Sequence, residues 1–275
     1  MTLNKLIEGA SKLAIKFNSR QLEQFQIYYE ELVEWNKKCN LTSIVDYAEV
    51  QVRHFLDSLS VTLALTKEEL EKPDFNIVDI GTGAGFPGVP LKIILSGPGL
   101  VLIESVGKKT AFLQYIVAKL ELNNVEVIHG RAEEVARTSL YREQFYLAVS
   151  RAVASLPTLV ELALPFCRIG GKFVAPKKGE VSAEIDKANK AVLTLGGRLG
   201  SVKRVELEQV RDERYLIVFD KISPTSEKYP RKPGLARRRP IQNDGGSSPP
   251  RSSSGEEIKR ETLVPLTPYL ARERR

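Results

Sequence analysis

The sequence has few of the residues that build disulfide frameworks, metal clusters or membrane spans. It holds two cysteines, Cys39 and Cys167, and two histidines, His54 and His129, and these four residues share no metal-ligand spacing. No segment approaches the roughly 18 consecutive apolar residues that cross a bilayer, and the first residues lack the apolar core of a signal peptide. We therefore expect a cytoplasmic protein that binds no metal and does not associate with a membrane.

Most of the chain also lacks an excess of charge of either sign. Residues 1–227 hold 29 basic and 29 acidic residues, whereas the whole chain of 275 residues carries a net charge of +7. Nearly all of the excess lies in residues 228–239, KYPRKPGLARRR, which hold six basic residues and no acidic one. Because arginine pairs bidentately with phosphate oxygens, this basic arm is a candidate phosphate-binding element. A solvated basic linker is the alternative.

The last part of the chain has too few apolar residues to form a core. Residues 242–275 begin QNDGGSSPPRSSSGEE and are rich in Ser, Gly and Pro. Such a composition buries too little apolar surface to offset the entropy lost on folding, so we expect a disordered tail. The chain as a whole is 42% hydrophobic, which is ample for a globular core in the residues that precede the tail.

Helical periodicity dominates residues 1–72. Ser19 is a candidate N-cap of a first helix whose apolar residues recur at i, i+3 and i+4. Asp46 and Glu49 have the spacing of a capping box and predict a second helix that runs to about Leu65. We expect this N-terminal helical segment to pack on the rest of the protein. The apolar face of the first helix comprises Leu22, Phe25, Tyr29, Leu32 and Val33.

Short apolar runs alternate with helical segments over residues 73–241. The runs NIVDI, LVLIE, VEVIH, FYLAV and KFVAP are each followed by a helical segment, a pattern typical of a mostly parallel sheet covered on both faces. The last two runs, VKRVELEQV and RYLIVFDKI, are separated only by RDE and predict an antiparallel hairpin. The expected fold is therefore α/β, with a mostly parallel, seven-stranded sheet that ends in an antiparallel hairpin.

A glycine-rich stretch, DIGTGAGFPG at residues 79–88, follows the first strand directly. Glycine tolerates φ > 0 and lets backbone N–H groups approach a ligand with no Cβ in the way. The carboxyl end of a parallel strand is also the usual ligand position in open α/β sheets. The stretch therefore predicts a small-molecule site, although a turn that serves only close packing is the alternative.

Two nucleoside-binding patterns fit this stretch. Gly83, Gly85 and Gly88 satisfy the dinucleotide pattern G-x-G-x-x-G, whereas the residues from Asp79 to Gly85 satisfy D-x-G-x-G-x-G. Glu104 ends the second strand and can accept hydrogen bonds from ribose hydroxyls in either case. Both patterns therefore indicate a nucleoside ligand.

The rest of the chain favours S-adenosylmethionine over a nicotinamide cofactor. A nicotinamide enzyme normally adds a catalytic domain with a proton donor after the nucleotide-binding half, whereas here the sheet is followed only by the basic arm and the polar tail. S-adenosylmethionine already carries an activated methyl group, so the protein mainly has to align it with a nucleophile. A nicotinamide-dependent oxidoreductase and a non-catalytic RNA-binding module remain the alternatives.

A set of motifs resembles one enzyme family. NLTSI, HFLDSL, VDIGTGAGFPGVPLKI, ESVGKKTAFL, GRAEE, SRAVASL and YPRKPG occur in the order seen in the bacterial 16S rRNA guanine-N7 methyltransferase G family, also called glucose-inhibited division protein B. The resemblance covers roughly residues 15–241. It implies a class I methyltransferase, Rossmann-like fold, S-adenosylmethionine as cofactor, and N7-methylation of a guanine in the 530 loop of 16S rRNA. The partner is then 16S rRNA or the small ribosomal subunit, and we expect a monomer.

The resemblance also implies roles for individual residues. Gly81 and Phe86 would line the cofactor pocket, and Ala132 and Glu133 of GRAEE would frame its adenine end. Arg151 of SRA would lie at the reaction mouth as the catalytic residue, where it can hold guanine O6 or an RNA phosphate. The full set of expected cofactor contacts is Asp79, Gly81, Gly83, Gly85, Phe86, Glu104, Ala132, Glu133 and Arg151. The expected RNA contacts are Lys178, Arg231, Lys232, Arg237, Arg238 and Arg239.

The residue inventory agrees with chemistry at guanine N7. This atom has a lone pair and no proton to lose, so its methylation needs no general base. The Asn/Asp-Pro-Pro-aromatic stretch of adenine amino-group methyltransferases is missing after the fourth strand. Cys167 lies in no recognisable catalytic setting, which disfavours base C5 methylation. His54 lies on a helix, and we expect Asp57 to pair with it or with Arg53.

Overall fold

A computed structural model describes residues 2–151, 154–207 and 212–242. Its centre is a seven-stranded sheet in the order β3-β2-β1-β4-β5-β7-β6. The first five strands are parallel, and β7 pairs antiparallel with both β5 and β6. The predicted α/β fold and its antiparallel end are thereby confirmed. The strands are β1 Asn76–Ile80, β2 Gly99–Glu104, β3 Val125–His129, β4 Phe145–Val149, β5 Cys167–Lys178, β6 Gly197–Val205 and β7 Arg214–Lys221.

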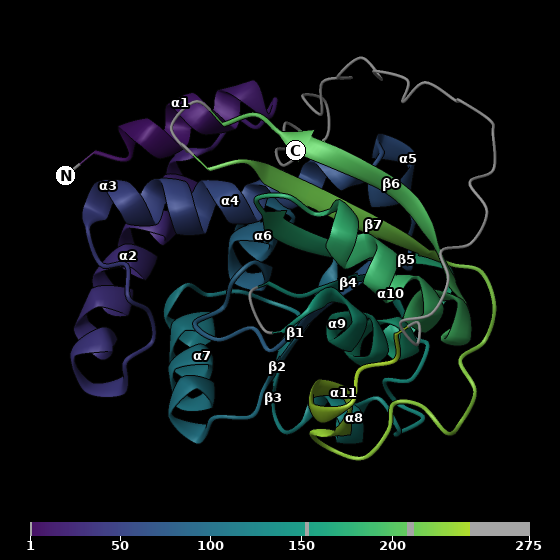
Figure 1. Ribbon diagram of the computed structural model, residues 1–275. Helices are drawn as coiled ribbons and strands as arrows, with labels where there is room; N and C mark the ends of the chain where they lie inside the picture. The colour runs from purple at the N-terminus through teal and green to yellow at the C-terminus, as the bar shows by residue number, and fades with distance from the viewer. Residues whose placement is uncertain (1, 152–153, 208–211, 243–275) are drawn as a thin grey trace.

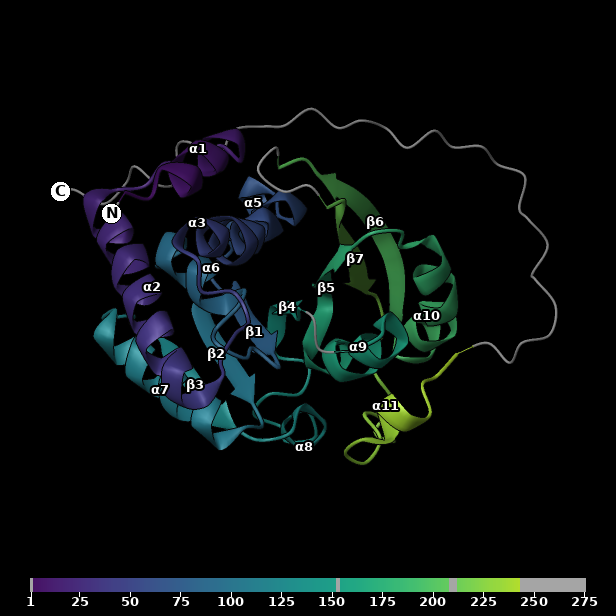
Figure 2. The same cartoon turned by 60° about the vertical axis from the view of Figure 1, so that its left-hand side comes forward.

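Helices cover both faces of the sheet (Figures 1 and 2). Alternate residues of β1 enter two different cores. Ile77 packs in the core formed with the N-terminal helices, α6 and α7, whereas Val78 and Ile80 pack in the core formed with α8 to α11. Strands buried on both faces read as continuous apolar runs, which is why the sequence pattern identified them. The helices are α1 Asn4–Lys12, α2 Ser19–Cys39, α3 Tyr47–Val50, α4 Asp57–Leu59, α5 Lys67–Leu70, α6 Gly88–Ile94, α7 Gly107–Lys119, α8 Ala132–Val135, α9 Leu156–Ala163, α10 Ser182–Thr194 and α11 Leu235–Arg238.

The N-cap and the buried face of α2 differ from the prediction. Asn18, not Ser19, is the N-cap: its side chain accepts from the Gln21 N–H, and the Gln21 side chain accepts from the Asn18 N–H. Tyr28 is fully buried, whereas Tyr29 is only half-buried. The face of α2 that packs on α6 and α7 is therefore turned by about one residue from the expected one.

The helical run from Tyr47 to Ala64 is not a single α-helix. Asp46 caps it as predicted by accepting from the Glu49 N–H. A π-helical stretch, Gln51–Leu56, then separates α3 from α4, and a 3₁₀ turn, Ser60–Ala64, ends the run. A π-helical turn changes which of the following residues face the sheet, and such turns are frequent at functional sites. The prediction did not include α1 or α5.

β6 lies earlier in the chain than the predicted run VKRVELEQV. β6 begins at Gly197, before the run in which the sequence indicated a strand, and its pairing with β7 is irregular between Leu199 and Ser201. The tail predicted to be disordered lies outside the described residues except for its first residue, Gln242. Within the described residues no helix combines the length and the apolar character needed to cross a membrane.

Candidate active site

The glycine-rich loop leaves β1 at the carboxyl edge of the sheet and is tied to β2. The N–H groups of Gly81 and Thr82 donate to the carbonyl of Ile103 at 2.9 and 3.2 Å. Gly81, Gly83 and Gly85 have φ of 65°, 63° and 98°. This left-handed conformation costs a residue with a Cβ about 1–2 kcal/mol. The turn therefore favours glycine at all three positions.

The glycines of the loop differ in what a side chain would meet. A Cβ at Gly85 would lie 2.6 Å from the Tyr28 hydroxyl oxygen, and one at Gly88 would lie 2.7 Å from Cδ2 of Leu102. A Cβ at Gly83 would meet no atom of the described residues within 4 Å. Gly85 and Gly88 thus permit close packing, whereas Gly83 borders open space that a ligand can enter.

The carboxylate of Asp79 holds the glycine-rich loop through two hydrogen bonds. One carboxylate oxygen, Oδ2, accepts from the Thr82 hydroxyl at 2.6 Å and from the Gly88 N–H at 2.7 Å. The other oxygen, Oδ1, is buried and has no hydrogen-bond partner among the described residues. Burial raises the pKa of Asp79 to about 6. A buried acceptor with no donor marks the loop as a place where a polar ligand group is expected.

Most backbone donors of the loop are already used within the protein. A pyrophosphate, as in a dinucleotide, is normally held by free N–H groups at this position. Residues 79–91 also contain no lysine or arginine that could balance a pyrophosphate charge. The loop therefore fits an uncharged or cationic nucleoside better than a dinucleotide. The N–H groups already used belong to Gly81, Thr82, Gly83, Gly85, Phe86 and Gly88.

Glu104, at the end of β2, faces the same loop. Its Oε2 accepts from the Gly83 N–H and its Oε1 accepts from the Val106 N–H, each at 2.9 Å. A carboxylate has about four acceptor positions, so each oxygen can accept one more hydrogen bond. Glu104 can therefore hold the loop and still accept from the two hydroxyls of a ribose. With the open space at Gly83, these residues fit the nucleoside part of S-adenosylmethionine.

Arg151 leaves the end of β4 and turns towards the N-terminal helical segment. Its Nη1 donates to Oδ2 of Asp57 at 2.7 Å and to the carbonyl of Arg53 at 3.1 Å. Its Nη2 lies 3.3 Å from Nδ1 of His54. The guanidinium carbon is 5.2 Å from the centre of the Phe86 ring, within cation–π distance. The side chain is 13% exposed, so its orientation is set by the protein.

The environment of His54 keeps its imidazole neutral. Burial, and then the charge of Arg151, lower the pKa of His54 to about 3. Nδ1 can therefore accept from Arg151, which makes Nε2 the donor to the Thr42 hydroxyl at 2.8 Å. The ring stacks on Phe86, with centroids 4.5 Å apart. Phe86 lies between His54 and Tyr28, so it is 5% exposed and supports the site rather than forming an open pocket wall.

The expected partner of Asp57 was wrong. Its carboxylate pairs with Arg151 and with Arg214, the first residue of β7, and not with His54 or Arg53. Arg53 instead pairs with Glu49 and Asp212. A helical i, i+3 or i, i+4 rule could not predict this arrangement, because both partners of Asp57 come from distant strands.

The residues expected at the adenine end follow β3. Ala132 and Glu133 begin α8 and are 8% and 7% exposed. Oε1 of Glu133 accepts from the N–H of Gly234 at 2.9 Å. Glu133 therefore fixes the basic arm beside α8, as the neighbouring α8 and α11 in Figure 1 show.

The basic arm is attached to the protein body and is not a solvated linker. Glu161 on α9 is fully buried, and its carboxylate accepts from the backbone N–H, Nε and Nη2 of Arg231. Arg137 and Arg142 donate to backbone carbonyls of residues 225–230. The Arg231 guanidinium therefore has a structural role through Glu161, and its expected role as an RNA contact stays a prediction. The expected contacts that remain exposed are Lys178, Lys232, Arg237, Arg238 and Arg239.

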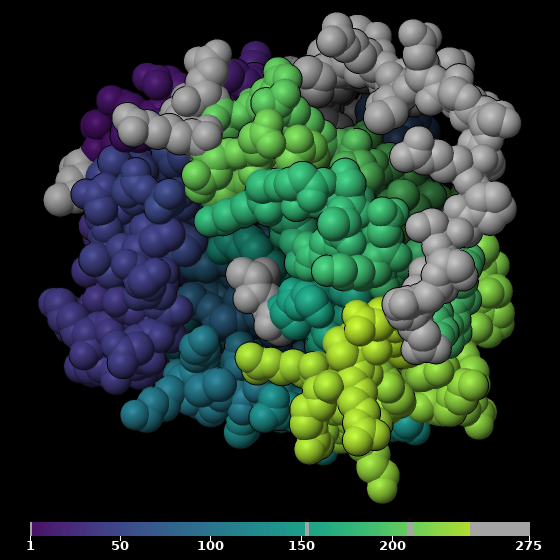
Figure 3. Space-filling model, in the orientation of Figure 1, coloured from purple at the N-terminus to yellow at the C-terminus, as the bar shows by residue number. Residues whose placement is uncertain are grey.

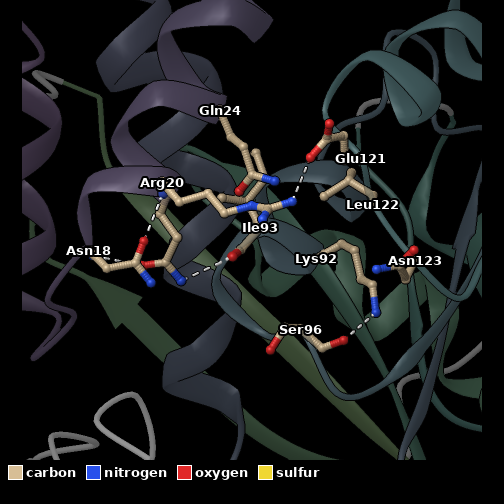
Figure 4. Close-up of a pocket in the computed structure, with 10 residues that line it drawn as sticks. Asn18, Arg20, Gln24, Lys92, Ile93, Ser96, Glu121, Leu122 and Asn123 are labelled. Carbon is tan, nitrogen blue, oxygen red and sulfur yellow. Dashed lines mark hydrogen bonds and ion pairs between the residues drawn. The ribbon is translucent and has the colours of Figure 1, made fainter. Parts of the chain in front are cut away.

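The molecular surface is hollowed between the N-terminal helices and the carboxyl-terminal half of the sheet, with the arm below it (Figure 3). A separate pocket of about 230 Å³ includes Lys92, Ser96 and Glu121 in its lining (Figure 4). Ser96 precedes β2 and Glu121 precedes β3, so this pocket lies at the amino ends of the strands. It is thus at the opposite edge of the sheet from the glycine-rich loop.

Burial makes Cys167 unsuited to act as a nucleophile. Burial raises the pKa of the Cys167 thiol to about 12, which removes the thiolate that a nucleophile requires. Over the described ranges of the chain no group of three His, Cys, Asp or Glu side chains could hold a metal ion.

Comparison with known proteins decides the family. A family model described as "GidB: rRNA small subunit methyltransferase G" matches residues 21–214. The chain belongs to the rRNA small subunit methyltransferase G family. The resemblance drawn from the motifs is thereby confirmed.

Relatives of this methyltransferase G family member match over most of its length. The ribosomal RNA small subunit methyltransferase G of Dehalococcoides mccartyi is 48% identical over 239 residues, which cover 87% of this chain and 100% of the relative. The proteins of the same name from Roseiflexus castenholzii and Brevibacillus brevis are 46% and 40% identical, over 87% and 88% of this chain and 100% of each relative. Geranyl diphosphate C-methyltransferase from Streptomyces coelicolor A3(2) has a TM-score of 0.46 and 15% identity, over 71% of this chain and 98% of that chain.

Sequence reasoning missed three residues that shape the site of this methyltransferase G family member. Tyr28 packs against the loop and donates to the Ala84 carbonyl, Arg214 pairs with Asp57, and Glu161 holds the arm. Glu161 was detectable, because it is an acid within the apolar run of α9. Tyr28 and Arg214 gave no comparable signal, since tyrosine on a helix and arginine at a strand start are ordinary.

Proposed function

We propose that this chain transfers a methyl group from S-adenosylmethionine to N7 of a guanine in the 530 loop of 16S rRNA. The observation that carries the cofactor assignment is the loop itself. Gly83 borders open space beside Glu104, while the neighbouring N–H groups that would hold a pyrophosphate are already used. The family of rRNA methyltransferases supports the substrate, and we propose that the enzyme acts in the cytoplasm as a monomer.

The residues present suit attack by N7. Bound at the loop, S-adenosylmethionine would supply a methyl group on a sulfonium, which becomes a neutral thioether as the N7 lone pair forms the new bond to carbon. No proton leaves the base in this step, so no general base is required. Arg151 would donate to guanine O6 and leave the N7 lone pair free. Its role would then be to orient the base for in-line attack.

The exposed cations around the hollow suit an RNA ligand. Lys178 lies at the carboxyl end of β5, and Lys232, Arg237, Arg238 and Arg239 lie on the arm. The arm is held against α8 and α9 by Glu133 and Glu161, so these charges are at a fixed place relative to the loop. We propose that they bind rRNA phosphates on either side of the target guanine.

The test uses the full chain with radiolabelled S-adenosylmethionine and either free 16S rRNA or small subunits, followed by nucleoside analysis. Label in N7-methylguanosine supports the proposal, and label on another nucleoside overturns the target assignment. Calorimetry with S-adenosylhomocysteine and with NAD addresses the cofactor: binding of NAD alone would favour an oxidoreductase, and binding of neither with retained RNA affinity would favour a non-catalytic RNA-binding module. Arg151→Ala should keep its affinity for S-adenosylhomocysteine and lose turnover.

A further inference from the structure

Asp57 is a buried carboxylate shared by two arginines from distant strands. It lies at the start of α4, directly after the π-helical stretch, and is 3% exposed. Oδ2 accepts from Nη1 of Arg151 at 2.7 Å, and Oδ1 lies 3.5 Å from Nη1 of Arg214. Arg151 follows β4 and Arg214 begins β7. One side chain of the N-terminal helical segment thus joins the ends of two strands, β4 and β7, at the same edge of the sheet.

The contacts of Arg151 leave it two donors for a substrate. A guanidinium has five N–H groups. The two N–H groups of Nη1 donate to the carboxylate of Asp57 and to the carbonyl of Arg53, and one N–H group of Nη2 donates to Nδ1 of His54. Nε–H and one N–H of Nη2 therefore have no partner among the described residues. These are the groups that can reach guanine O6 or a phosphate.

We propose that Asp57 is a positioning residue for methyl transfer, which acts by fixing the guanidinium of Arg151; the assignment rests on the proposed function. Asp57 is the negatively charged partner in this set, whereas His54 is neutral and Phe86 contributes a ring face. Its contact with Arg151 is a charge-assisted hydrogen bond, the stronger kind. Without the carboxylate, Arg151 and Arg214 would both be cations with no shared counter-charge. The N-terminal helical segment therefore completes the active site.

Of the expected cofactor contacts, Asp57 touches only Arg151, which the proposed function assigns to the base. The glycine-rich loop and Glu104 are held by β1, β2 and Asp79. Removing the Asp57 charge should therefore leave the cofactor site intact and misplace only the base. For Asp57→Asn we expect a fall in kcat of roughly 30-fold or more, an affinity for S-adenosylhomocysteine within about twofold of wild type, and a smaller change in the KM for RNA.

A double-mutant cycle tests the route through Arg151. If Asp57 acts by way of Arg151, then Asp57→Asn in an Arg151→Ala background should cause no further loss of kcat. Asp57→Glu, which keeps the charge, should recover part of the rate. Glu69→Gln is the matched control. Glu69 belongs to the same N-terminal helical segment as Asp57, forms a part-buried ion pair with Lys172 of β5 at 2.6 Å, and lies outside the site. The kcat of this variant should stay near wild type.

Three results would overturn the proposal. The first is an Asp57→Asn enzyme with wild-type kcat. The second is a double variant whose loss of kcat equals the product of the losses in Asp57→Asn and Arg151→Ala, and the third is a Glu69→Gln control whose kcat falls as far as that of Asp57→Asn. Binding of S-adenosylhomocysteine reports whether each variant is folded. If Asp57→Asn does not fold, Asp57→Glu, whose longer side chain displaces the carboxylate, should still have a kcat below that of wild type, and a wild-type kcat would overturn the proposal. The same cycle followed by urea unfolding needs no substrate. If the shifts of the urea midpoint in Asp57→Asn and Arg151→Ala simply add in the double variant, Asp57 and Arg151 are not coupled. The proposal would then fail whatever substrate the protein methylates.

Discussion

The substitution Gly83→Ala should change two measurable quantities by different amounts: the stability of the folded protein and its affinity for the cofactor. The substituted Cβ would meet no atom of the described residues within 4 Å, so the folded protein should accommodate it without a clash. The remaining cost is the left-handed φ of 63°, which is about 1–2 kcal/mol for alanine. At roughly 2–4 °C per kcal/mol for a chain of this size, the melting temperature should fall by no more than about 8 °C.

The loss of cofactor affinity should be larger than this loss of stability. The added methyl group occupies the space beside Glu104 that we assign to the nucleoside. A ribose displaced from Glu104 loses hydrogen bonds to a carboxylate, each worth about 1.5–3 kcal/mol. The affinity for S-adenosylhomocysteine should therefore fall roughly 100-fold, since 1.4 kcal/mol corresponds to a factor of ten.

The assay is calorimetry with S-adenosylhomocysteine together with thermal unfolding in the absence of ligand. Gly85→Ala is the control, because its Cβ would lie 2.6 Å from the Tyr28 hydroxyl oxygen and 2.8 Å from Cγ2 of Val89 at a φ of 98°. It combines strain with overpacking and should lose more stability than Gly83→Ala, by about 1–3 kcal/mol. Unchanged affinity in Gly83→Ala would refute the placement of the cofactor beside this glycine.

Further predictions concern the arm and the loop carboxylate. Neutralising the three arginines at 237–239 should weaken RNA binding and reduce the slope of log K against log salt by about 2–3; a slope equal to that of wild type would make the arm a structural element only. Arg231→Met should lower the free energy of unfolding in urea by about 3–5 kcal/mol, because it leaves the fully buried carboxylate of Glu161 without its ion-pair partner. Glu161→Gln should cost less, because the unpaired Arg231 can turn to solvent. Equal losses in the two variants would contradict this reasoning. The pKa of Asp79 is raised to about 6, so the carboxylate loses its charge as the pH falls through 6. The hydrogen bond that it accepts from Gly88 then weakens. The affinity for S-adenosylhomocysteine should therefore decline below pH 6. The folded state binds this proton before the unfolded chain does, so the same group adds stability as the pH falls from about 6 towards 4; calorimetry at several pH values, with a pH-independent Asp79→Asn as control, checks the decline.

The sequence predicted the central strands β1, β2 and β4 well because both of their faces are buried. Continuous apolar runs such as NIVDI and LVLIE can be recognised without knowing their neighbours. The N-terminal helical segment was predicted less well, since its π-helical and 3₁₀ stretches depend on packing against the sheet. The predicted cap at Ser19 and the buried Tyr29 were wrong by one position each, which is the usual scale of error at an element boundary.

The residues of the candidate site also differ in how far the sequence alone could place them. The sequence already indicated that Asp79, Gly83 and Glu104 lie together, because Asp79 and Gly83 belong to one strand-loop motif and Glu104 ends the next parallel strand; their contact with the cofactor stays a prediction. The ion pair of Arg231 could not be predicted, because its buried partner Glu161 is 70 residues away in the chain. Charge in the sequence indicates a cation but does not show whether the folded protein has already paired it.

By itself, the sequence determined the α/β sheet and the concentration of nearly all the excess positive charge in one short arm, and it predicted a nucleoside site after the first strand. Only the tertiary structure decided which glycine borders open space, which arginine is committed to a buried carboxylate, and that Asp57 joins Arg151 to Arg214. The reason is physical: backbone conformation and apolar periodicity are local properties, whereas pairing of buried charges depends on which distant segments the fold brings into contact.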